Sequence, residues 1–149
     1  MPTRTFTQTF AVATDPAALR GFLLDPHSFP KIHPLIASVS VEREREEAGG
    51  RVTEFVAIEH VPLLGFTLRN RLRCEAFDDP ARPEHVRAVA RVDPGVVVDS
   101  TYTIEATPDG CRATQLLTLT APWGTMGFVY RTAVAAHTRQ AAAIQAHFA

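Results

Sequence analysis

A change in hydrophobic period near Thr125 constrains the fold of this chain more than any other feature. From Thr125 to Phe148 there is no proline and alanine is abundant, a composition that favours a helix. Apolar side chains recur there at helical spacing and fall on one stripe. At about 1.5 Å per residue, such a helix is roughly 35 Å long and can cross a whole sheet. The stripe consists of Met126, Val129, Tyr130, Ala133, Val134, His137, Ala141, Ile144 and Phe148.

Most of the sequence before this helix alternates apolar and polar residues, which is the pattern of β-strands. The first strand covers residues 5–12. Asp15 and Pro16 then favour the start of a short helix that ends near Asp25. The proline-rich segment 26–34 predicts a second short helix or tight turns. Six further strands are predicted over residues 35–46, 51–61, 66–77, 86–92, 96–106 and 111–120.

Six consecutive strands joined by short turns form an antiparallel meander. We therefore expect an α+β helix-grip fold. In it, a seven-stranded curved antiparallel sheet wraps around the long C-terminal helix, and two short helices lie between strands 1 and 2. The length of 149 residues fits one domain, residues 1–149.

This order of elements resembles, over essentially the whole chain, the START-like, or SRPBCC, superfamily, which includes birch pollen allergen, polyketide cyclase/dehydrase and lipid-transfer proteins. Two segments carry the most specific likeness. Residues 25–39 (DPHSFPKIHPLIASV) look like the family's entry into the second strand, and residues 117–124 (LTLTAPWG) match its strand-to-helix junction. The resemblance implies a cavity between sheet and helix that holds a hydrophobic molecule. Some members do chemistry in that cavity, but they share no catalytic motif that could be carried over to this chain.

On a curved sheet, one face of every strand points at the helix, and we take the more apolar face as the inner one. This rule places Val52, Val56, Ile58 and His60 inside on the third strand, and Leu68, Asn70, Leu72 and Cys74 inside on the fourth. A bulge would invert any such assignment. From these faces and the helix stripe, we predict the ligand-binding residues Ile58, His60, Asn70, Leu72, Val98, Tyr102, Gln115, Leu117, Tyr130 and His137.

His137 is the most informative polar residue, because it lies near the middle of the apolar helix stripe. A buried imidazole needs a hydrogen-bond partner, which could be Asn70, Tyr102, Gln115, His60, a water molecule or a ligand. Three roles stay open: a core histidine, a residue that orients the ligand, and a general acid or base. His137 is the best catalytic candidate if the protein is an enzyme.

Other polar residues suggest weaker sites. Glu54 would point inward with Val56 and could form a dyad with His137. His27 and His33 flank a loop that we expect to be solvated, and their spacing suits no standard zinc site. We therefore expect no metal site. The sequence has no phosphate-binding loop, dinucleotide fingerprint or thiol redox pair, so we also expect no cofactor. Phe128 would lie on the outer side of the helix, a hint of a homodimer contact.

The charge and hydropathy exclude several classes of partner. The formal net charge of −1 gives no attraction to nucleic acid. No apolar stretch approaches the roughly 20 residues that span a bilayer. The first residues have no basic region followed by an apolar run, so we expect no signal peptide. We expect a cytoplasmic protein without stable membrane insertion.

Three functions remain open. The first is binding of a small apolar molecule, such as a lipid, isoprenoid or aromatic compound. The second is catalysis of the polyketide cyclase or dehydratase type, with His137 as acid or base. The third is a protein-interaction module, which predicts a filled core without a cavity.

Overall fold

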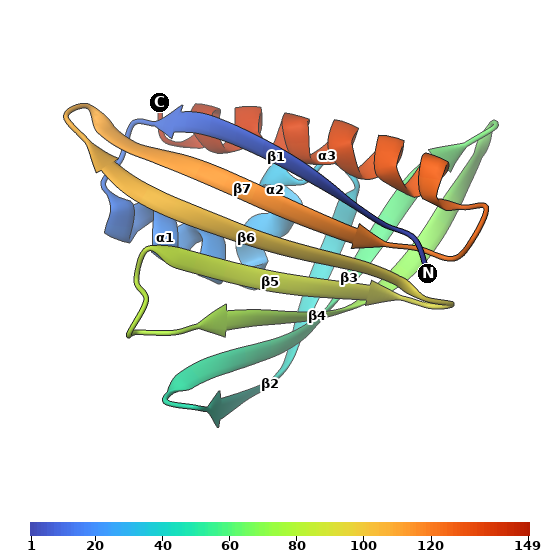
Figure 1. Cartoon of the computed structure of the whole chain (residues 1–149), viewed down its shortest axis with the longest axis horizontal. Coiled ribbons are helices and arrows are strands. Elements are labelled where there is room, and N and C mark those ends of the chain that lie inside the picture. The colour runs from blue at the N-terminus through green and yellow to red at the C-terminus, as the bar shows by residue number, and fades with distance from the viewer.

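A computed structural model describes residues 1–149 as one curved antiparallel sheet gripping a long helix (Figure 1). The strands follow the spatial order β1-β7-β6-β5-β4-β3-β2, so β2 to β7 form a meander and β1 joins its far edge beside β7. The strands are β1 (Thr3–Val12), β2 (Ile36–Glu47), β3 (Gly50–Leu63), β4 (Phe66–Asp78), β5 (His85–Val92), β6 (Val96–Thr107) and β7 (Gly110–Thr120). The helices are α1 (Pro16–Leu24), α2 (Phe29–Ile32) and α3 (Met126–His147). The predicted helix-grip fold is confirmed.

Aspartates and prolines set the boundaries of the short helices. The Asp15 carboxylate accepts a hydrogen bond of 2.8 Å from the Ala18 backbone N–H, and Pro16 occupies the first turn of α1. Asp25 ends α1 and caps the 3₁₀ turn Pro26–Ser28, which leads into α2. These turns bring α2 against α3 and the concave face of the sheet. The loop before β2 is therefore part of the core.

The helix α3 closes the concave face by burying one side against β1 and β7. Ile144 from α3 and Leu117 and Leu119 from β7 are completely buried. Alternate residues of β7 face the helix as predicted, and their neighbours face outward: Leu116 is 46% exposed. The inward faces of β4 and β6 also follow the predicted pattern. No helix of the structure combines the length and the apolar character needed to cross a membrane.

The predicted inward face of β3 is wrong. Phe55, Ala57 and Val61 are buried on the concave side, whereas His60 is exposed. Both faces of β3 carry apolar side chains, so the rule that the more apolar face points inward fails on this strand. Val56 and Ile58 lie on the outer face beside Arg73 and Arg71, which occupy the paired positions of β4. Aliphatic stems of arginine can cover apolar side chains while the guanidinium stays in water.

The same inversion removes the predicted Glu54–His137 dyad. The Glu54 carboxylate lies on the outer face, where it accepts a hydrogen bond from Arg43 and forms an ion pair with Arg45 at 3.2 Å. These guanidiniums lower the pKa of Glu54, the Arg43 hydrogen bond contributing most. Glu54 is therefore part of a surface ion-pair network and lies outside the core.

The inner side of α3 is rotated from the predicted stripe. Ala136 and Gln140 are buried, and Phe128 lines the interior, so the predicted outward position of Phe128 is wrong. Tyr130 lies on the opposite flank, with the Arg4 guanidinium 3.7 Å above its ring. Phe128 therefore gives no support to a homodimer.

Two adjacent leucines on β7 test this packing. We expect Leu117→Ala to lower the free energy of unfolding by about 2–5 kcal/mol, because it opens a hole under α3. Leu116→Ala removes the same atoms from the outer face and should cost less than about 1 kcal/mol. Urea unfolding of both variants measures the difference. Equal losses would mean that the register of β7 is wrong.

Candidate functional site

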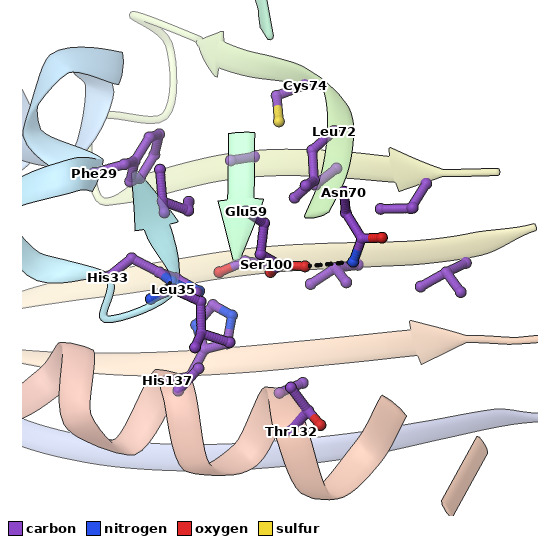
Figure 2. Close-up of a pocket in the computed structure, with 18 of the residues that line it drawn as sticks. Phe29, His33, Leu35, Glu59, Asn70, Leu72, Cys74, Ser100, Thr132 and His137 are labelled. Carbon is purple, nitrogen blue, oxygen red and sulfur yellow. Dashed lines mark hydrogen bonds between the residues drawn. The ribbon is translucent and has the colours of Figure 1, made fainter. Parts of the chain in front are cut away.

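A cavity of about 300 Å³ lies between the concave face of the sheet and α3 (Figure 2). Its wall has 30 residues, of which 21 are hydrophobic. They come from β3, β4, β5 and β6, from α3 between Phe128 and Gln140, from α1 and from the segment around α2. The volume is at the lower end of the range of roughly 300–1,000 Å³ that is typical of small-molecule sites.

Burial of the lining residues shows where the cavity opens. Leu68, Asp93 and Pro94 are exposed, and they lie at the β3–β4 hairpin and the β5–β6 turn. Leu23 and Tyr102 line the cavity and are buried, at 2% and 5% exposure. The cavity thus runs from an opening between two hairpin ends to a closed end near α1.

The side chain of His137 is held by a hydrogen-bond network inside the sheet. Gln115, completely buried on β7, donates from its amide nitrogen to His137 Nδ1 at 3.0 Å and to Ser100 Oγ at 2.8 Å. Gln8 on β1 donates to the Gln115 amide oxygen at 2.7 Å and to the His137 backbone carbonyl at 2.9 Å. His137 therefore finds one of its predicted partners, Gln115.

His33 lies beside His137, and its prediction as a solvated loop residue is wrong. It is 8% exposed, and its ring stands perpendicular to that of His137 with 5.3 Å between ring centres. The Leu35 backbone N–H donates to His33 Nδ1 at 3.2 Å. The neighbouring α2 buries Ile32 and stacks Phe29 on Phe55, which draws His33 inside. The apolar residues Phe29 and Ile32 in the sequence just before His33 were the signal that this segment turns inward.

Both imidazoles are neutral at physiological pH. Burial lowers the pKa of His33 to about 4. Burial, followed by the proximity of His33, lowers the pKa of His137 to about 3, against a smaller raising contribution from Gln140. A neutral imidazole has one N–H donor and one acceptor nitrogen.

Glu59 and Asn70 form a second polar group in the wall, opposite α3 in Figure 2. The Asn70 amide donates to Glu59 Oε1 at 3.1 Å. Burial raises the pKa of Glu59, and the Asn70 hydrogen bond partly offsets this. Glu59 was missed because β3 was assigned the wrong inner face. The two-residue turn Leu64–Gly65 could have revealed it. This turn sets a register that pairs Glu59 with Asn70, a residue correctly predicted to face inward.

Two polar atoms of the cavity wall are buried without any hydrogen-bond partner. They are the Tyr102 hydroxyl and the Gln140 amide oxygen. Burial also raises the pKa of Tyr102, and it raises the pKa of the Cys74 thiol to about 12. Both groups are therefore protonated at neutral pH. An unpaired buried polar atom is costly, so these atoms are candidates to contact a ligand or a water molecule.

The structure separates the ten predicted ligand-binding residues into two sets. The residues that line the cavity are Asn70, Leu72, Val98, Tyr102 and His137. The residues outside its wall are Ile58, His60, Gln115, Leu117 and Tyr130. Ile58 and His60 fall on the wrong face of β3. Gln115 and Leu117 face inward but are covered, so that Gln115 can reach a ligand only through His137.

The sequence matches the family model "Polyketide cyclase / dehydrase and lipid transport" over residues 3–149, and the chain belongs to this family. The predicted membership of the START-like superfamily is confirmed. Membership supports hydrophobic ligand binding or a role of the polyketide cyclase type. No curated protein matches the sequence significantly.

Solved structures share the fold at low sequence identity. The di-domain aromatase/cyclase StfQ from the steffimycin biosynthetic pathway superposes with a TM-score of 0.72 at 13% identity, covering 98% of this chain and 51% of StfQ. This chain thus spans about half of that protein. The Zhui aromatase/cyclase from Streptomyces sp. R1128 gives a TM-score of 0.67 at 18% identity, with 98% and 93% covered. A START superfamily protein from Mycobacterium smegmatis gives 0.67 at 13% identity, with 98% and 96% covered.

The two buried histidines predict acid sensitivity. Their folded-state pKa values lie below the ordinary 6.5, so the unfolded chain binds more protons as the pH falls. Stability should be complete above pH 6.5 and decline from there toward pH 4, by up to about 1.4 kcal/mol per pH unit for each histidine.

Urea unfolding between pH 7.5 and 4.5 checks this slope in the variant His33→Gln, which should reduce it. His60→Gln is the matched control, since that imidazole is exposed on β3. Identical slopes for the wild type and His33→Gln would contradict the burial of a neutral His33.

Proposed function

We propose that this protein binds a small, mostly apolar molecule in the cavity between the sheet and α3. The observation that carries the proposal is the cavity itself, which is open at one end, apolar along its walls and supplied with a few convergent polar groups. Such a combination is the usual form of a small-molecule site. Tyr102 and Gln140 belong to this wall, and their unpaired hydroxyl and amide oxygen support the proposal, because a ligand that shifts either buried side chain could satisfy them.

Two alternatives from the sequence receive less support. A protein-interaction module predicts a filled core, whereas about 300 Å³ lies between sheet and helix. Acid or base catalysis by His137 is disfavoured by its low pKa and by Gln115, which occupies the Nδ1 lone pair. A neutral imidazole whose acceptor nitrogen is already bonded is a poor base.

We also propose that residues 1–149 act as one domain and that the protein works in the cytoplasm. All seven strands belong to one sheet, and α3 packs against strands from the sheet's far edge. This arrangement supports a single unit, since the sheet and α3 together contain all the strands and the long helix.

Filling the cavity should abolish binding. Ala88 lines the cavity from β5 and is half-buried, so Ala88→Phe places a ring in the ligand's space. We expect 2-acetylnaphthalene to bind the wild type and Ala88→Phe to weaken binding at least tenfold, or about 1.4 kcal/mol. Displacement of the fluorescent probe 1-anilinonaphthalene-8-sulfonate measures both affinities.

Ala135→Phe is the matched control, because Ala135 is exposed on α3 and outside the cavity wall. It should change the affinity less than twofold. The proposal fails if the probe does not bind the folded wild type, or if both variants bind it equally well.

A cyclase-type activity is a second candidate, and Glu59 is the observation that favours it. Its raised pKa makes the carboxylate a stronger base than an exposed glutamate. Ring closure between a ketone and an activated carbon begins with removal of a proton next to a carbonyl. Glu59 could accept that proton, while Asn70 holds the carboxylate in place.

Exchange of the protons next to the carbonyl of benzoylacetone for deuterium tests this second candidate. We expect the wild type to accelerate the exchange and Glu59→Gln to remove most of the acceleration, because an amide cannot take the proton. Glu54→Gln is the control from the outer face of the same strand. Equal acceleration by the wild type and Glu59→Gln would eliminate Glu59 as the base.

A further inference from the structure

The hydrogen-bond network behind His137 determines which ring nitrogen carries the proton. A backbone carbonyl can only accept, so the amide nitrogen of Gln8 must face the His137 carbonyl. The same nitrogen donates to the Gln115 oxygen, which turns the Gln115 nitrogen toward Ser100 and His137. His137 Nδ1 therefore accepts, and in the neutral ring the proton is on Nε2.

The same reasoning applies to His33 through a different donor. The Leu35 backbone N–H can only donate, so His33 Nδ1 accepts and Nε2 carries the proton. No hydrogen bond within the chain has the geometry to occupy either Nε2 atom, although the Gln140 side chain lies near enough to His137 to raise its pKa; both rings line the cavity. Figure 2 shows the two side chains converging from α3 and from the end of α2.

We propose that His33 and His137 form a paired N–H donor site for an oxygen atom of the ligand, and that Gln8 and Gln115 are positioning residues that fix His137 as a donor. The preferred ligand is then an apolar molecule with a ketone, quinone or phenol-type oxygen. This inference rests on the proposed binding function and specifies its ligand class.

Amines and pure hydrocarbons fit this site less well. An ammonium group has no lone pair for an N–H donor and would face two donors at once. A hydrocarbon leaves both donors unsatisfied in an apolar cavity, which carries a cost of about 1–3 kcal/mol for each buried group. A ligand oxygen removes that cost, because it has two lone pairs.

Long-range ¹H–¹⁵N NMR of histidine-labelled protein reads the protonated nitrogen directly. At pH 7 we expect both His33 and His137 in the Nε2–H form in the wild type. Gln115→Met removes the donor to Nδ1 and should give His137 a mixture of both forms. Arg139→Met, a change to methionine on the exposed side of α3, should leave the spectrum unchanged. An Nδ1–H form of His137 in the wild type would overturn the inference without any ligand.

Two probes of equal shape then test the choice of ligand. 2-Acetylnaphthalene and 2-isopropenylnaphthalene differ only in C=O against C=CH₂. We expect the ratio of their dissociation constants, alkene to ketone, to fall about tenfold from the wild type to His137→Met, which is about 1.4 kcal/mol. His137→Gln keeps an N–H donor and should restore part of the ratio. His60→Met, on the outer face, should leave it within twofold.

These outcomes distinguish a failure of the donor site from a failure of the binding function. If the ratio is unchanged in His137→Met while Ala88→Phe still weakens the binding of both probes, the donor site is overturned and the binding function stands. Failure of both probes to bind the folded wild type overturns the binding function as well. A ratio that falls in His137→Met and recovers in His137→Gln supports the donor site.

Discussion

The helix α3 packs against only one edge of the sheet, formed by β1 and β7, and the rest of the structure depends on this constraint. Leu117, Leu119 and Ile144 hold the helix to the β1–β7 side. The strands β3 to β6 curve away from it, so the space beneath α3 between Phe128 and Gln140 stays open. The fold therefore produces the cavity as a consequence of where the helix is anchored.

A polar network continues from this anchor into the cavity. Gln115 lies between the buried Ala113 and Leu117 of β7 and reaches His137 across the interface. Burying an amide there is costly unless all its hydrogen bonds are made, and Gln8 and Ser100 complete them. The result is a histidine with a fixed orientation in an apolar cavity, an arrangement that supports the proposed role in ligand recognition.

The sequence predicted the fold well because period-two strands, turn residues and one alanine-rich helix all indicate the same arrangement. It predicted His137 and Asn70 in the cavity because their strand or helix has one clearly apolar face. It failed where both faces are apolar, as on β3, and so placed Ile58 inside and missed Glu59. It also missed His33, whose burial depends on how α2 packs against a helix more than 90 residues later. Such contacts between distant segments leave no periodic pattern.

A crystal structure of the complex with 2-acetylnaphthalene tests the central claim most directly. The account predicts the naphthalene rings between Ala88, Val98 and α3, with the carbonyl oxygen within hydrogen-bond distance of the Nε2 atoms of His33 and His137. Density for the ligand on the convex face, or an empty cavity at saturating ligand, would contradict the claim that this protein holds an apolar molecule between its sheet and its helix.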